Sequence, residues 1–105
     1  MIGALNVSFG EDGVVRWVLD HGKANEMGTA QLDGIDALCE ALESEPRAAA
    51  LVTWSRKVSS KGTPIFIAGA NVTERVGWPE DRVKAHVRRQ RETLARLRAA
   101  PVLHV

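Results

Sequence analysis

The stretch 64–74, which reads Pro-Ile-Phe-Ile-Ala-Gly-Ala-Asn-Val-Thr-Glu, constrains the fold of this chain most strongly. It starts as an apolar run typical of a buried strand and then breaks at Gly69, which lies between two alanines. Because no bulky side chain shields the backbone there, a ligand can approach the N–H groups of such a turn. Main-chain donors of this kind can hold an anionic oxygen without any side chain. The stretch predicts a strand that ends in an anion-binding turn, although a core strand followed by an ordinary turn explains the same pattern.

The length and composition indicate one small globular domain. The chain has 105 residues, of which 45% are hydrophobic, and a formal net charge of +1. This charge favours neither a nucleic-acid binder nor an acidic tail. The single cysteine, Cys39, cannot form an internal disulfide, which fits a reducing compartment. The N-terminus does not resemble a signal peptide, and no apolar run approaches the roughly 18 to 20 residues that span a membrane. We therefore expect a cytoplasmic protein.

The first half of the sequence predicts a hairpin and a helix. Residues 4–9 and 14–19 have strand character and flank a turn cluster at 10–13, which is typical of a β-hairpin. A loop follows at 20–26. A helix is predicted from Thr29, as its N-cap, to about residue 45, just before a proline. Its apolar residues recur at helical spacing: Leu32, Ile35, Leu38 and Leu42.

The second half predicts two more strands, a long helix and a final strand. Residues 48–54 form a compact apolar run, expected to be buried on both faces as parallel strands are. A polar loop at 55–63 leads to a strand at 65–67. A helix is predicted from Pro79 to about Ala99, with acidic residues in its first turn. Its apolar stripe consists of Val83, Val87, Leu94 and Leu97. A strand at 102–105 completes the order strand-strand-helix-strand-strand-helix-strand, which indicates an α/β fold.

Three segments resemble the crotonase (enoyl-CoA hydratase/isomerase) superfamily. Residues 66–74 are similar to its oxyanion-loop signature, with Asn71 where aspartate is common. Residues 24–27 occupy the place of the family's Ala-Asn-Ala-Leu, and Pro101-Val102 resembles its transition from helix to strand. Extra residues around 56–62 depart from the family's spacing. The resemblance implies a crotonase-like fold built from β-β-α repeats, in which residues 1–105 form the N-terminal part and the C-terminal half is absent.

The resemblance also implies the ligand and the site. It implies a coenzyme A thioester as the substrate, with no separate cofactor. The main-chain N–H of Ala70 would be one of two donors to the thioester oxygen as this oxygen becomes an enolate. Replacing aspartate by asparagine at Asn71 removes a charge but keeps the backbone donor. The residues implied to contact coenzyme A are Lys23, Ala24, Ala68, Gly69, Asn71, Val72 and Thr73. Lys23 would face the phosphates, as would Arg56, Lys57 or Lys61, although surface cations such as these are usually only solvated.

The remaining catalytic groups of the family have no counterpart in this sequence. The second oxyanion donor and the acid/base carboxylates follow the strand that begins at Pro101, where this sequence stops. We interpret Glu74 as a solvated turn residue and Glu80 as a helix-start charge. The resemblance implies that the intact protein hydrates a 2-enoyl-CoA, whereas residues 1–105 alone, which lack these groups, are expected to be inactive. The expected partners are the C-terminal half, as a further segment or chain, and copies of the protein in a trimer or hexamer.

Other functions remain as alternatives. The fold also supports isomerisation, hydrolysis or decarboxylation, and the chain could be a non-catalytic CoA-binding or assembly fragment. The second helix is strongly basic, which suits nucleic acid or a membrane surface. Its arginines, however, spread around the polar arc without interleaved aromatic residues. We therefore expect no nucleic-acid or membrane partner. We also expect no metal site, because the three histidines lack metal-ligand spacing with Cys39.

Overall fold

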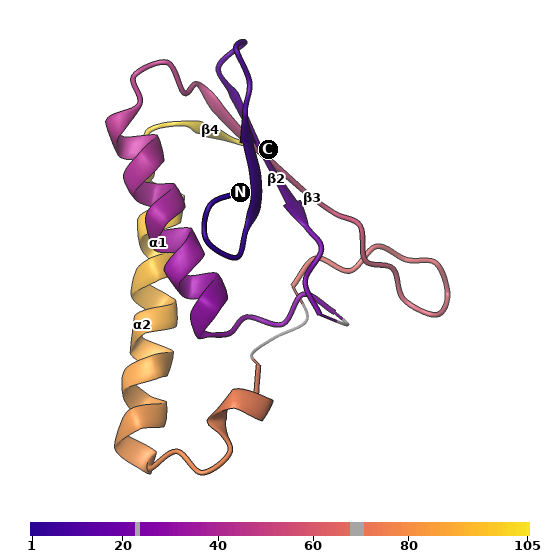
Figure 1. Ribbon diagram of the computed structural model, residues 1–105, viewed down its shortest axis with the longest axis vertical. Helices are drawn as coiled ribbons and strands as arrows, with labels where there is room; N and C mark the ends of the chain where they lie inside the picture. Colours follow the sequence, from indigo (N-terminus) through magenta and orange to yellow (C-terminus); the bar gives the residue numbers. More distant parts are fainter. Residues whose placement is uncertain (23, 68–70) are drawn as a thin grey trace.

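The computed structural model describes residues 1–22, 24–67 and 71–105, which form one sheet and two long helices (Figure 1). The sheet has the order β1-β2-β3-β4. Its first pair, β1 and β2, is antiparallel, whereas β2, β3 and β4 run parallel to one another. The bounds are Asn6–Phe9 for β1, Val14–Leu19 for β2, Ala50–Ser55 for β3 and Leu103–His104 for β4. The predicted hairpin and parallel strands are confirmed.

Helix α1, Thr29–Ser44, covers one face of the sheet with its apolar stripe. Leu32, Ile35, Leu38 and Leu42, predicted from their spacing, are all at most 1% exposed. They form the core together with strand residues such as Val15, Trp17 and Leu51. The prediction of Thr29 as N-cap is wrong, because Gly28 occupies that position. The Thr29 hydroxyl instead donates to the carboxylate of Glu74, 2.9 Å away.

Helix α2, Glu80–Ala99, lies alongside α1 and is held to it mainly by polar contacts (Figure 1). Arg89 pairs with Asp33 at 2.6 Å and with Asp36 at 2.8 Å. Further along the helix, Arg96 pairs with Glu43 at 2.6 Å. This explains why the predicted apolar stripe of α2 is partly wrong. Val87 and Leu94 are each 37% exposed, and the buried positions are His86 and Thr93.

The predicted strand at 65–67 is not formed, so the observed order has one strand fewer than expected. Only an isolated bridge joins Val58 to Pro64. The N–H of Ile65 bonds back to the carbonyl of Lys57 at 2.8 Å. The carbonyls of Ile65 and Phe66 accept from a side chain, described below, and not from a neighbouring strand. The apolar run is therefore extended backbone within a loop.

The face of the sheet that points away from α1 is largely open. Ala50, Val52 and Trp54 alternate with the buried Leu51, so they lie on this outer face. Trp54 is 41% exposed, and Leu103, which is paired with Ala50, is 67% exposed. The prediction that this strand is buried on both faces is thus wrong. The core that buries Leu51 lies on one side of the sheet, where α1 packs and where Leu97 and Ala100 also contribute.

Candidate functional site

The loop after β2, residues 20–28, and the segment 65–74 meet through one buried side chain. Asn25 is 3% exposed. Its Nδ2 lies 3.0 Å from the carbonyl of Ile65, 2.8 Å from that of Phe66 and 2.9 Å from the hydroxyl of Ser55. An amide nitrogen carries only two hydrogens, so these three acceptors share two donors. Asn25 therefore fastens the first loop to the end of β3 and to the second segment.

The backbone of Asn25 has an unusual conformation that suits this role. Its φ is +56°, in the left-handed region that asparagine tolerates better than most residues. Its Oδ1 accepts from the N–H of His21 at 2.9 Å, and its own N–H donates to the carbonyl of His21 at 2.9 Å. These bonds close the loop between the two residues. The sequence placed Asn25 in a motif, but the contacts of its Nδ2 lie 30 to 41 residues away and leave no local signal.

A second link joins the two segments close to the start of α1. The N–H of Asn71 donates to the carbonyl of Met27 at 2.9 Å. The carboxylate of Glu74 accepts from the N–H of Thr29 at 3.0 and 3.2 Å. The Glu74 side chain is 24% exposed. The interpretation of Glu74 as a solvated turn residue is therefore wrong, because its carboxylate has defined partners.

Some of the implied coenzyme A residues are described and others are not. Lys23, Ala68, Gly69 and the proposed donor Ala70 lie outside the described residues. The remaining four residues flank the two links: Ala24, Asn71, Val72 and Thr73. Ala24 and Asn71 are half-buried, whereas Val72 and Thr73 are exposed. The N–H of Ala24 donates to the Glu26 carboxylate at 3.1 Å. The structure thus brings together the segments that carry the implied residues.

A cavity of about 190 Å³ lies beside these loops. Apolar side chains from the core line much of it, including Leu19, Met27 and Ile67, and His21 and Asn25 add polar groups. A larger hollow of about 350 Å³ lies at the other end of β2, between the β1–β2 turn and Arg47. That hollow touches neither loop, so volume alone does not locate the site. The smaller cavity is the one that residues of both segments line, namely His21, Asn25 and Ile67, although none of Ala24, Asn71, Val72 and Thr73 lines it.

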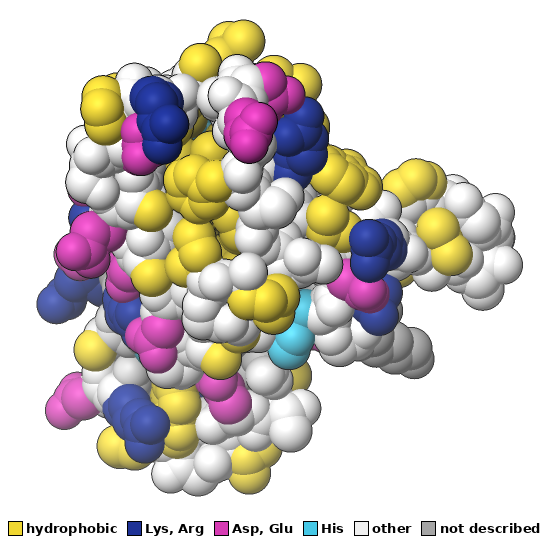
Figure 2. Space-filling view, turned by 45° about the horizontal axis from the view of Figure 1, so that its top comes forward, with side chains coloured by type: hydrophobic (Ala, Val, Ile, Leu, Met, Phe, Trp, Pro, Cys, Tyr) yellow, Lys and Arg dark blue, Asp and Glu magenta, His cyan; other side chains and the backbone are white. Residues whose placement is uncertain are grey.

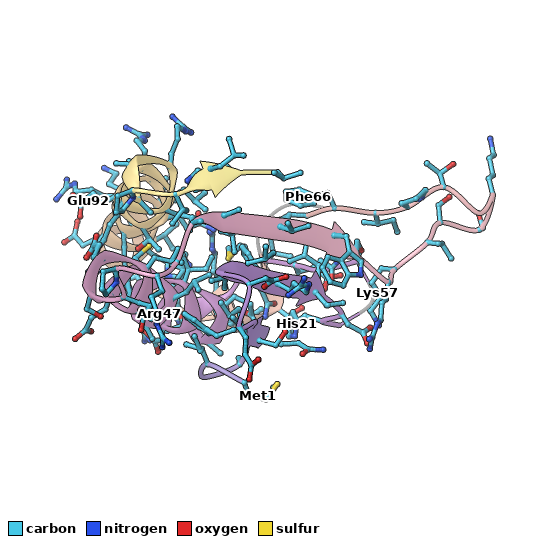
Figure 3. The ribbon with its side chains drawn as sticks, turned by 90° about the horizontal axis from the view of Figure 1, so that it is seen from above. Met1, His21, Arg47, Lys57, Phe66 and Glu92 are labelled. Carbon is cyan, nitrogen blue, oxygen red and sulfur yellow. The ribbon has the colours of Figure 1, made fainter. Side chains whose placement is uncertain are left out.

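Charged groups beside the first loop are already paired. The Nζ of Lys57 lies 3.0 Å from Asp20, and the Arg56 guanidinium lies 4.0 Å from the same carboxylate. Figure 3 shows Lys57 at the end of the sheet, with Phe66 and His21 on opposite sides of the β3 ribbon. Phe66 is 57% exposed. An incoming phosphate would therefore compete with Asp20 for these two cations.

Comparisons with known proteins identify the fold. No family model and no curated protein matches the chain. Among solved structures, the enoyl-CoA hydratase of Bacillus anthracis is 22% identical in sequence, with a TM-score of 0.81. The match covers 95% of this chain and 37% of the hydratase chain. The Mycobacterium smegmatis enoyl-CoA hydratase is 20% identical, also with a TM-score of 0.81, and the match covers 95% of this chain and 37% of the hydratase chain. An enoyl-CoA hydratase/isomerase from Xanthobacter autotrophicus is 17% identical, with a TM-score of 0.78, and the match covers 99% of this chain and 38% of that enzyme's chain.

The match extends over nearly all of this chain but over little more than a third of each solved structure. Among the helices of the described ranges, none is long and apolar enough to cross a membrane. The sheet, the two helices and their order agree with the α/β class expected from the sequence. The chain therefore has the crotonase-like fold of these enoyl-CoA hydratases, over about 37% of the length of the structures that it matches.

Proposed function

We propose that this chain supplies one wall of a coenzyme A thioester site. The observation that carries the proposal is the double link between the loop after β2 and the segment 65–74, through Asn25 and through Asn71. A ligand that runs along both loops would meet a surface whose spacing is already set. This pre-organisation reduces the entropy cost of binding. The N–H of Ala70 would then donate to the thioester oxygen.

In the intact protein, the proposed reaction is hydration of a 2-enoyl-CoA. The oxygen of water bonds to C3 as one of its O–H bonds breaks and the proton passes to a base, and the electron pair of the C2=C3 bond moves toward the thioester, whose oxygen becomes an enolate. A proton is then delivered to C2, so one water is added and nothing is oxidised or reduced. The Ala70 N–H would stabilise the enolate oxygen, an effect that grows in a site from which water is excluded. The second donor and the acid/base groups would come from a further segment or chain.

The open side of the sheet supports the part of the proposal that concerns a partner. β4 pairs with β3 over two residues, and Leu103 on the outer face of the sheet is 67% exposed, while Val105 just after β4 is 68% exposed. Trp54 adds exposed apolar surface on the same sheet. Exposed strand edges and apolar patches favour association. Figure 2 shows hydrophobic side chains gathered between charged ones, so another face of the molecule is also partly apolar.

The test starts with residues 1–105 expressed alone. Light scattering gives the mass, calorimetry gives the affinity for acetyl-CoA, and loss of crotonyl-CoA absorbance gives hydration. We expect an oligomer that binds acetyl-CoA without turnover, and turnover once a separately made C-terminal half is added. A well-folded monomer that hydrates crotonyl-CoA by itself would contradict the proposed division of the site. Failure to bind acetyl-CoA both alone and with the added half would refute the function.

The donor itself is tested by Ala70→Pro against Ala70→Gly. Proline removes the N–H, whereas glycine keeps it and changes only the side chain. With the C-terminal half present, loss of one oxyanion donor should lower turnover on the order of 100- to 1000-fold. Circular dichroism shows whether the fold survives in each variant. Equal turnover of the two variants, both folded, would rule out this role for the Ala70 N–H.

A further inference from the structure

The side chain of Glu74 joins parts of the chain that are far apart in sequence. Glu74 lies in a short 3-10 helix, η1, at Thr73–Arg75. Its carboxylate accepts the N–H of Thr29, at 3.0 and 3.2 Å, and the Thr29 hydroxyl, at 2.9 Å. The two residues are 45 positions apart. One carboxylate therefore receives both polar hydrogens that Thr29 can donate.

The position of this carboxylate is electrostatically favourable. Thr29 is the first residue of α1, and the N-cap Gly28 has no side chain to satisfy the free N–H groups of the first turn. Gln31 accepts only the N–H of Gly28, at 3.0 Å. A negative charge at a helix N-terminus is stabilised by the helix dipole. Glu74 thus supplies a cap that the local sequence lacks.

Close packing fixes the same segment at a second point. A Cβ added to Gly28 would lie 3.1 Å from the Glu74 carboxylate and 3.2 Å from the Cβ of Asn71. The segment therefore rests directly on the backbone of Gly28. Asn71 also donates to the carbonyl of Met27 at 2.9 Å. Residues 71–74 are held against residues 27–29 at both ends.

Helix α2 contributes a third contact to Glu74. The Nε2 of His86 lies 3.5 Å from the Glu74 carboxylate, and the His86 side chain is 7% exposed. The distance is that of an ion pair, but the geometry is not that of a hydrogen bond, so we interpret it as packing. The edge of Trp78 closes the other side of the imidazole, with the ring centres 5.2 Å apart. Glu74 is thus enclosed between α1 and α2.

We propose that Glu74 is a positioning residue for the thioester site, which it serves by fixing residues 71–74 against the start of α1. The inference rests on the proposed function, in which the Ala70 N–H is the oxyanion donor. Ala70 is bonded directly to Asn71, so the placement of Asn71 limits where that donor can lie. A displacement of about 1 Å at a reacting group can cost roughly 100-fold in rate. Glu74 acts on the ligand only through this backbone.

The first test measures positioning without any ligand. Amide hydrogen exchange at Thr29 and Asn71 is followed by NMR in the parent chain, Glu74→Ala and Glu74→Gln. Glu74→Ala should speed exchange at both amides by about tenfold or more, because their protection then depends on a looser segment. Glu74→Gln keeps an acceptor and should restore most of the protection at Asn71. Glu92→Ala, an exposed glutamate of α2, serves as the control and should change neither amide.

The outcome at Asn71 decides between positioning and simple capping. If Glu74→Ala exposes Thr29 but leaves Asn71 within twofold of the parent, Glu74 is only a helix cap and the proposal is wrong. Should Glu74→Ala fail to fold, Thr29→Val removes the hydroxyl alone and should speed exchange at Asn71 several-fold. Unchanged exchange at Asn71 in folded Thr29→Val would equally overturn the proposal.

The second test uses cinnamoyl-CoA, whose conjugated thioester absorbs at longer wavelength when its carbonyl is polarised by hydrogen-bond donors. In the parent chain we expect a red shift on binding. Glu74→Ala should lose most of the red shift while the affinity falls less, and Glu74→Gln should retain part of it. An unchanged shift in folded Glu74→Ala would refute positioning. If the parent chain binds cinnamoyl-CoA neither alone nor with the added C-terminal half, the proposed function fails, and the exchange experiment still decides what Glu74 does.

Discussion

Replacing Asn25 by alanine should destabilise the protein more than any surface substitution. Two amide hydrogens are shared among the oxygens of Ser55, Ile65 and Phe66, and Oδ1 accepts from His21. Three hydrogen bonds are therefore lost, at about 1 kcal/mol each. Alanine must also adopt a φ of +56°, which costs about 1 to 2 kcal/mol. The sum is about 4 to 5 kcal/mol, a large part of the roughly 5 to 15 kcal/mol that stabilises a typical domain.

Urea unfolding monitored by tryptophan fluorescence measures this loss, since Trp17 is 4% exposed in the folded state. Asn25→Gly is the matched control, because glycine accepts the backbone conformation and loses only the amide. It should cost about 3 kcal/mol, and the difference between the two variants isolates the strain. Asn25→Asp keeps the acceptor for His21 but directs a carboxylate at two carbonyls, so it should be as harmful as alanine. A loss below about 1 kcal/mol in Asn25→Ala would refute the assigned hydrogen bonds.

Three further predictions concern the helices. Gly34→Ala should lower the melting temperature, because its Cβ would lie 2.7 Å from the Leu5 Cγ; this overpacking costs about 1 to 3 kcal/mol and exceeds the gain of about 1 kcal/mol in helix propensity. Burial raises the pKa of the Cys39 thiol, so its reaction with a thiol reagent at pH 8 should be on the order of 100-fold slower in the folded protein than in urea. The hydrogen bond from the Arg96 guanidinium lowers the pKa of Glu43 in the folded protein. This pair therefore stabilises the fold fully at pH values above the pKa of glutamate in the unfolded chain, and the stabilisation is lost as the pH falls through the lower pKa that Glu43 has in the folded protein. Glu43→Gln should therefore weaken the dependence of the melting temperature on pH in the acid range, and an unchanged dependence would contradict the ion pair.

The spacing of apolar residues along the sequence predicted an element correctly where hydrophobic burial alone determines how that element packs. The stripe of α1 is apolar at its inward positions apart from the buried Gln31, so its spacing predicted both the helix and its buried face. The stripe of α2 was only partly right: Leu97 packs against the core, but Val87 and Leu94 are exposed, and ion pairs such as Arg89 with Asp33 join the two helices. Charge spacing on one helix does not reveal which carboxylates the other helix presents. The strand predicted at 65–67 failed for a related reason, since its carbonyls bond to Asn25, which is 40 and 41 residues away.

In the candidate site, too, local sequence predicted some features, whereas contacts between distant residues determine the others. The small residues of the stretch 64–74 and the motif at 24–27 located two loops, and the structure joins them. What holds the loops together could not be read from either motif. The partners of Asn25 and Glu74 are set by the tertiary fold, and each of these side chains also fits an ordinary turn. The assignment of Ala70 as the oxyanion donor stays a prediction, because this residue lies outside the described ranges.

The contact between Thr29 and Glu74 also has a consequence for the order in which the protein folds during synthesis. The N-terminus of α1 receives its carboxylate cap from a residue made 45 positions later. At about 5 to 20 residues per second, the ribosome needs roughly 2 to 9 seconds to add that stretch. Until then the first turn of α1 has no acceptor for the Thr29 N–H other than water, and it should fray. The first strand-strand-helix unit therefore leaves the ribosome unfinished, and its completion waits for the segment that it later holds in place.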